Sequence, residues 1–135
     1  MLQPKKQKYR KQFRSGAKSI ASRGTALNFG DYGLKSLQNG RLSEKQIEAA
    51  RRAVTHFTKR GGKLWIRVFP DKPVTQKPAG SRMGAGKGDV KGYVALVTAG
   101  RIIFEIAGVS EKVAEEAFLR AAHKLPIRTR FVSKE

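Results

Sequence analysis

The sequence contains no cysteine, which excludes disulfide bonds, thiolate metal sites and a cysteine nucleophile. It also lacks any run of about eighteen apolar residues, the length needed to span a membrane as a helix. Its N-terminus has no apolar segment of the signal-peptide type. We therefore expect a soluble, intracellular protein whose fold depends on its hydrophobic core.

Acidic residues are scarce. The 135 residues include 29 Lys and Arg but only 10 Asp and Glu, which gives a formal net charge of +19. Such a charge would repel itself in a compact monomer unless an anionic partner relieved the repulsion. Nucleic acid is the commonest such partner and an anionic membrane the second. Composition alone therefore leaves a free-standing nucleic-acid- or membrane-surface-binding protein open as an alternative.

The N-terminal segment is the most one-sided part of the chain, because its first carboxylate is Asp31. Tyr9 and Phe13 lie among its cations, a combination that suits stacking on bases as well as phosphate contact. We interpret residues 1–26 as an extended basic arm that binds RNA, and a solvated tail is the alternative. The arm residues predicted to bind are Lys5, Lys6, Lys8, Tyr9, Arg10, Lys11, Phe13, Arg14, Lys18 and Arg23.

A second unusual stretch alternates glycines with cations between Lys77 and Asp89. Glycine lets a main chain approach an anion closely, and cationic side chains donate strong hydrogen bonds to phosphate. A nucleotide-binding phosphate loop is excluded by spacing, since Ser81 and Gly88 stand where that motif needs a glycine and a hydroxyl residue. We predict an irregular projecting loop over residues 70–91. Its predicted contact residues are Lys77, Arg82, Met83, Gly84, Gly86, Lys87 and Gly88.

Two amphipathic helices are expected. Ser43 and Gln46 form a capping box ahead of an apolar stripe that begins at Ile47, and Gly61-Gly62 should end this helix. Ser110 should cap the second helix, which Pro126 closes. Cations on or just beyond the far side of the first helix are predicted to contact RNA, with a solvated charged face as the equal alternative. They are Arg51, Arg52, Lys59, Arg60 and Lys63.

The remaining apolar stretches indicate strands, with an antiparallel hairpin at Ala99-Gly100. The expected strands cover residues 27–37, 64–69, 93–98, 101–107 and 127–132. Together with the helices they predict a single α+β domain over residues 27–135, with two helices packed on a mainly antiparallel sheet.

The sequence contains no arrangement of residues that is typical of a catalytic site. His56 and His123 lie on the predicted helices without carboxylates at metal-ligand spacing, and most acids lie at helix starts, where capping explains them. We expect no enzyme activity, no metal and no cofactor.

Several motifs, in this order, resemble those of the bacterial large-subunit ribosomal protein sixteen family, and the resemblance covers almost the whole chain. The most specific are Ile66-Arg67-Val68-Phe69-Pro70-Asp71-Lys72-Pro73, Arg82-Met83-Gly84-Ala85-Gly86-Lys87-Gly88 and Leu125-Pro126-Ile127-Arg128-Thr129. Shorter matches occur at residues 8–12, 29–34, 46–53 and 60–63.

The resemblance implies a hammerhead-like α+β domain in a non-enzymatic component of the large ribosomal subunit. It implies binding to large-subunit rRNA, contact with neighbouring ribosomal proteins and contact with aminoacyl-site tRNA near the peptidyl-transferase region. Contact with peptidyl-site tRNA stays open. The expected location is a cytoplasmic ribosome, with an organellar ribosome as the alternative, and the expected protein is neither membrane-bound nor a homo-oligomer.

Overall fold

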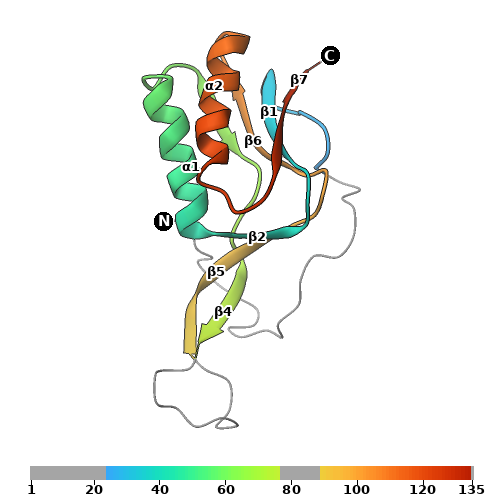
Figure 1. Ribbon diagram of the computed structural model, residues 1–135, viewed down its shortest axis with the longest axis vertical. Coiled ribbons are helices and arrows are strands. Elements are labelled where there is room, and N and C mark those ends of the chain that lie inside the picture. Colours follow the sequence, from blue (N-terminus) through green and yellow to red (C-terminus); the bar gives the residue numbers. More distant parts are fainter. Residues whose placement is uncertain (1–23, 77–88, 135) are drawn as a thin grey trace.

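The computed structural model describes residues 24–76 and 89–134 (Figure 1). The predicted arm contacts from Lys5 to Arg23 and the predicted loop contacts from Lys77 to Gly88 lie outside the described residues. The described part is an α+β structure with two helices and two antiparallel sheets.

The larger sheet has four strands in the order β3-β6-β1-β7. These are β1 (Tyr32–Ser36), β3 (Lys63–Ile66), β6 (Ile102–Ala107) and β7 (Thr129–Ser133). Both neighbours of β1 run antiparallel to it, and its register with β6 shifts between Leu34 and Lys35. Such a shift marks a β-bulge or a similar irregularity, and the strand is shorter than the predicted stretch of residues 27–37.

The smaller sheet has the order β2-β5-β4 and extends away from the helices (Figure 1). It contains β2 (Gly40–Ser43), β4 (Lys72–Gln76) and β5 (Asp89–Val97), all antiparallel. The prediction that residues 70–91 are irregular is therefore wrong for residues 72–76 and 89–91, which belong to paired strands, while residues 77–88 lie outside the described chain. Pro73 is compatible with β4 because that strand lies at an edge of the sheet.

The two helices lie side by side on one face of the larger sheet (Figure 1). The first, α1 (Glu44–Phe57), begins with the predicted capping box: Gln46 N–H donates to Ser43 Oγ, and Ser43 N–H donates to Gln46 Oε1. The second, α2 (Glu111–Ala122), is capped by Ser110 as predicted. Helix α1 ends earlier than Gly61, because Lys59 and Arg60 take positive φ angles of 54° and 63°.

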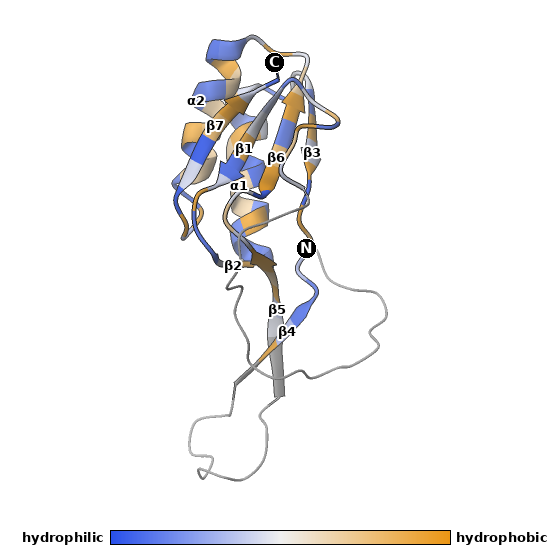
Figure 2. Cartoon of the chain, turned by 90° about the vertical axis from the view of Figure 1, so that its right-hand side faces the viewer, coloured by the Kyte–Doolittle hydropathy of each residue, from blue (hydrophilic) through white to orange (hydrophobic). Residues whose placement is uncertain are grey.

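The core lies between the helices and the strands, and Figure 2 shows β6 as predominantly apolar. Ile47, Ala50 and Val54 of α1 are fully buried, as are Ala117 and Phe118 of α2. These positions confirm the predicted apolar stripes of both helices. Burial of these stripes is the main source of stability for a domain of this size.

The predicted hairpin of residues 93–98 and 101–107 is wrong. Residues 93–97 belong to β5 and pair with β2, whereas β6 pairs with β1 and β3. The turn at Gly100 instead contacts the connection after β1: Gly100 N–H donates to the Ser36 carbonyl, and Ala99 N–H donates to Asn39 Oδ1. The chain therefore crosses from one sheet to the other at this point, and a single sheet does not form.

Candidate RNA interface

A fully buried carboxylate fixes the start of the described chain to the larger sheet. Glu105 lies in the middle of β6, opposite Gly33 on one side and Trp65 on the other. Its Oε1 atom accepts hydrogen bonds from the backbone N–H groups of Asn28, Phe29 and Gly30 at 2.9, 2.9 and 3.0 Å. Three donors on one oxygen make a tight anion-binding turn, and this turn holds residues 24–31 against the sheet. We call this arrangement the Glu105 clasp.

The electrostatics of the Glu105 clasp favour the ionised carboxylate. Burial alone would raise the pKa of Glu105, but the hydrogen bonds from Gly30 and Phe29 and the ion pair with Arg67 outweigh it, so its pKa lies below the ordinary value. Arg67 Nη1 pairs with Glu105 Oε2 and also donates to the Ala26 carbonyl at 3.1 Å. The charge of Glu105 is thus neutralised within the fold and repels no polyanion.

Cations and aromatic rings alternate along the outer side of the clasp. The Arg67 guanidinium lies 5.3 Å from the centre of the Phe29 ring, Phe29 stacks on Trp65 at 5.9 Å, and Lys63 Nζ lies 5.2 Å from the Trp65 ring. Phe29 remains 57% exposed. This surface offers both positive charge and ring edges beside the point where the predicted arm joins the body, a combination typical of RNA-binding surfaces.

Close packing explains two glycines of the clasp. A Cβ on Gly30 would lie 2.7 Å from the Ile106 carbonyl oxygen, and one on Gly33 would lie 2.4 Å from a methyl carbon of Leu27. Both glycines therefore let residues 24–31 lie directly on β1 and β6.

The β4–β5 ladder fixes the two ends of the predicted loop. Its last pair joins Gln76 to Asp89, so residues 77–88 connect two strand ends that lie opposite each other. The register of the ladder shifts between Val74 and Thr75. Only the base of the predicted loop, and none of its predicted contact residues, lies within the described chain.

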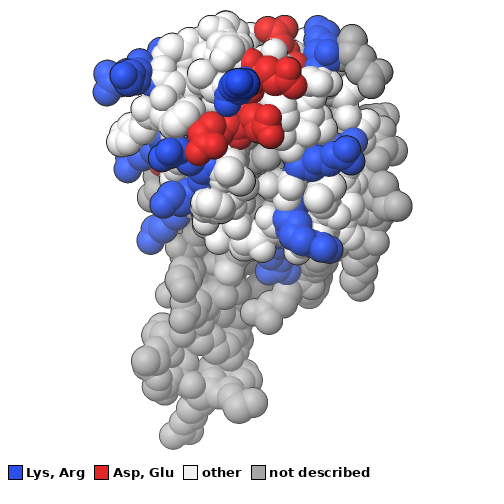
Figure 3. Space-filling view, turned by 45° about the horizontal axis from the view of Figure 1, so that its top comes forward, with Lys and Arg blue, Asp and Glu red and all other residues white. Residues whose placement is uncertain are grey.

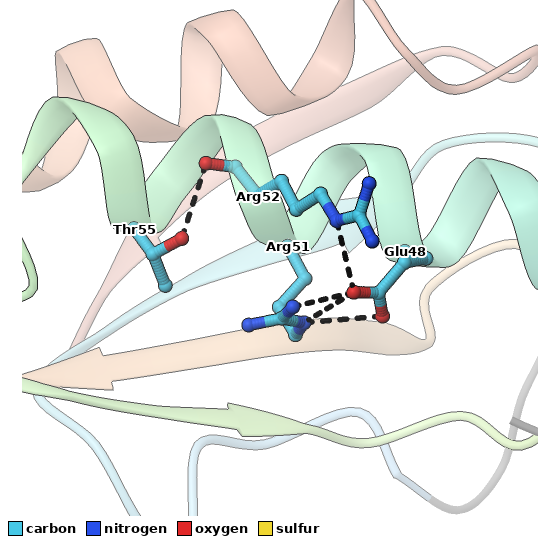
Figure 4. Close-up of polar contacts among 4 residues, drawn as sticks. All are labelled: Glu48, Arg51, Arg52 and Thr55. Atoms are coloured by element: carbon cyan, nitrogen blue, oxygen red, sulfur yellow. Dashed lines mark hydrogen bonds and ion pairs between the residues drawn. The ribbon is translucent and has the colours of Figure 1, made fainter. Parts of the chain in front are cut away.

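The predicted cations on α1 and just beyond its end fall into two groups. Arg51 and Arg52 both bind Glu48, as Figure 4 shows. The Nε atom of Arg51 lies 3.1 Å from Glu48 Oε2, and the Nε atom of Arg52 lies 3.3 Å from Glu48 Oε1. The hydrogen bond from Arg51 lowers the pKa of Glu48, so this carboxylate stays ionised beside them. The group keeps a single net positive charge, which weakens it as a phosphate site.

Lys59, Arg60 and Lys63 form the second group and are all exposed. Backbone hydrogen bonds hold their turn: Lys59 N–H donates to the His56 carbonyl and Arg60 N–H to the Thr55 carbonyl. The left-handed conformation of two successive residues that are not glycine is strained, and such strain often accompanies functional sites. These three cations are therefore better placed for phosphate contact than Arg51 and Arg52.

Acidic side chains lie on a different part of the surface from these cations. On the face shown in Figure 3, acidic side chains form one patch with Lys and Arg side chains spread around it. Helix α2 carries Glu111, Glu115 and Glu116, and Glu116 pairs with Arg120 at 3.5 Å. This face suits a polyanion poorly.

The described residues contain no group of three or more His, Asp or Glu side chains that could hold a metal ion. Within the same part of the chain, no helix is long and apolar enough to cross a membrane.

Sequence reasoning missed the Glu105 clasp. A signal was present, because Glu105 interrupts the apolar run of residues 102–107. A charge inside a buried strand requires a partner of opposite charge and additional donors. The sequence does not show that residues 28–30, more than seventy positions away, supply those donors.

The fold and this surface define a small, basic α+β protein suited to a polyanionic partner. Residues 4–132 match the family described as ribosomal protein L16p/L10e. The chain is 57% identical to the large ribosomal subunit protein uL16 of Albidiferax ferrireducens, over 99% of this chain and 97% of that protein. It is 55% identical to the protein of the same name from Polaromonas naphthalenivorans, with the same coverage. The chain belongs to the ribosomal protein L16p/L10e family, and it is a ribosomal protein, not an enzyme.

Proposed function

We propose that the protein is a structural component of the large ribosomal subunit that binds large-subunit rRNA. Family membership, relatives that carry the name of a large-subunit protein and the net charge of +19 support this function. We further propose that it contacts aminoacyl-site tRNA near the peptidyl-transferase region. Peptidyl-site tRNA is a second contact of the same kind.

The observation that carries the proposal is the Glu105 clasp. A fold that buries an ionised carboxylate to hold residues 28–30 fixes where the basic N-terminal segment joins the body. In the proposed function, residues 1–26 form an extended arm in rRNA, and Arg82 and Lys87 belong to a projecting loop directed at tRNA. The body anchors both extensions.

The acidic face of α2 indicates which surface of the protein does not contact rRNA. Glu111, Glu115 and Glu116 would repel phosphate, so this face turns away from rRNA in the proposed arrangement. It is therefore available to solvent or to neighbouring ribosomal proteins.

Salt dependence tests the rRNA part of the proposal. If the chain neutralises about eight phosphates, its affinity for an rRNA fragment should fall by roughly three to five decades between 50 and 200 mM salt. The measurement is a filter-binding or anisotropy titration of the full chain at several salt concentrations. A salt slope near zero would contradict the proposal.

Alanine variants test the tRNA part. Arg82→Ala and Lys87→Ala should slow tRNA-dependent steps of reconstituted large subunits while the melting temperature of the free chain stays unchanged. Lys112→Ala, an exposed cation on α2, is the matched control and should affect neither property. A loss of thermal stability without an effect on tRNA steps would assign Arg82 and Lys87 to the fold.

Sedimentation separates this function from a free-standing binder. Nearly all of the protein should sediment with large subunits after a wash at moderate salt. Recovery mainly on DNA or on anionic vesicles would instead support the alternative.

A further inference from the structure

A groove of about 520 Å³ lies where the two sheets meet. Its lining comes from the last residue of β3, the connection between β3 and β4, the first residue of β4, the C-terminal part of β5 and the turn before β6. The polar and aromatic side chains that line it are Arg67, Phe69, Asp71, Lys72 and Arg101. This volume suits a single nucleotide or a ligand of similar size.

Phe69 gives the groove an exposed aromatic wall. Its side chain is 45% exposed, although a phenyl ring normally avoids water. The ring belongs to no aromatic pair among the described residues. An exposed ring beside cations is the arrangement on which unpaired bases stack.

Arg101 adds positive charge to the lining of the groove. Its Nη2 atom donates to the Arg67 carbonyl at 3.3 Å, whereas its buried Nε atom has no hydrogen-bond partner within the described residues. The charge of Arg67 itself is neutralised by Glu105. Arg101 therefore contributes positive charge to the groove, and Asp71 opposes part of it.

The groove lies between the two described chain segments that lead into the proposed extensions. On one side, the Gly24 carbonyl accepts a hydrogen bond from Ile102 N–H at 2.7 Å, so the root of the arm lies next to Arg101. On the other side, Lys72 begins the strand that leads to residues 77–88. An RNA strand that contacts both extensions would pass this groove.

We infer that the groove binds one unpaired nucleotide of the RNA partner. The base stacks on Phe69, the positive charge of Arg101 holds the phosphate, and Asp71 accepts a hydrogen bond from an amino group of the base. Cytosine carries such an amino group and uracil does not. This inference rests on the proposed RNA-binding function and specifies one contact within it.

The test compares single-stranded oligo(C) with a blunt RNA duplex of the same length, by fluorescence anisotropy with the full chain. Phe69→Ala and Phe69→Leu should each weaken oligo(C) binding roughly tenfold and change duplex binding less than twofold, whereas Phe69→Tyr should keep both. Because the ring carries no charge, the salt slope should not change in any Phe69 variant. Leu119→Ala, which removes another exposed apolar side chain, is the control and should leave both affinities unchanged.

Base preference tests the role of Asp71. The wild-type chain should prefer oligo(C) to oligo(U) by roughly fivefold, and Asp71→Ala should remove the preference. Equal binding of both oligomers by the wild type would overturn this hydrogen bond.

The possible outcomes distinguish a failure of the nucleotide groove from a failure of the proposed RNA-binding function. If the wild type binds neither oligo(C) nor duplex, the proposed RNA-binding function fails. If the wild type binds both and all Phe69 variants behave like it, the function stands and the nucleotide groove is wrong. The groove would then be available to a side chain of a neighbouring protein, and the single-nucleotide assignment would be withdrawn.

Discussion

At the scale of single residues, Glu105 has the largest structural role of any carboxylate described above. It has no exposed surface, yet its oxygens bind three backbone N–H groups and one guanidinium. The ion pair and the hydrogen bonds together offset the cost of removing the charge from water. Loss of the charge should therefore cost more than loss of an ordinary surface group.

Glu105→Gln should lower the free energy of unfolding by about 3 kcal/mol, because it leaves Arg67 largely buried without its counter-ion. Urea unfolding followed by the fluorescence of Trp65 measures the change. Glu115→Gln, at an exposed position of α2, should shift the free energy by less than about 0.5 kcal/mol. Equal effects of the two substitutions would contradict the clasp.

The pKa of Glu105 predicts a dependence of stability on pH. Since its pKa in the folded state lies below the unfolded value of about 4.3, the clasp contributes fully above that pH and is lost as pH falls through the folded pKa. The stability difference between wild type and Glu105→Gln should therefore shrink as the pH falls below about 4.3. A difference that stays constant over this range would show that the charge is not responsible.

Contacts between residues close together in the sequence were predictable, and contacts between residues far apart in the sequence were not. Ser43 and Gln46 lie three positions apart, and their capping box is present as predicted. The partners of Glu105 lie on a segment with no regular secondary structure, so no periodicity indicates them.

At the scale of elements, the turns decide how the strands divide between two sheets. Ala99-Gly100 has the composition of a tight hairpin, but hydrogen bonds to Ser36 and Asn39 bind this turn to another turn. The strand β2 is short and begins at a glycine, and it is absent from the strands predicted from the sequence. Strand composition predicted most strands but could not assign their partners.

A glycine near the start of β3 gives a test at this scale. Gly62 has a φ angle of +74°, and a Cβ there would lie 2.5 Å from the Ala107 carbonyl oxygen. Gly62→Ala should lower the free energy of unfolding by about 2 kcal/mol.

Gly92→Ala is the matched control, because a Cβ on Gly92 meets nothing within 4 Å. Its effect on the free energy of unfolding should lie within about 1 kcal/mol of zero. If both variants unfold at the same urea concentration, the close approach of Gly62 to β6 has no energetic importance.

At the scale of the whole molecule, some cations are paired with carboxylates within the described fold, and others are exposed without such an ion pair in the described residues. Glu105 and Glu48 are paired with arginines, whereas Lys59, Arg60 and Lys63 are exposed. Composition predicted only an anionic partner, because net charge is a property of the whole chain. Composition could not predict the groove beside Phe69, which requires residues from both sheets.

The central claim is that the folded body anchors two basic extensions in rRNA. A density map of the chain within the large subunit tests it most directly. We predict nucleotides in contact with residues 1–23 and with residues 77–88, and the Glu105 clasp intact between them. A map in which either segment contacts no nucleotide would contradict the account.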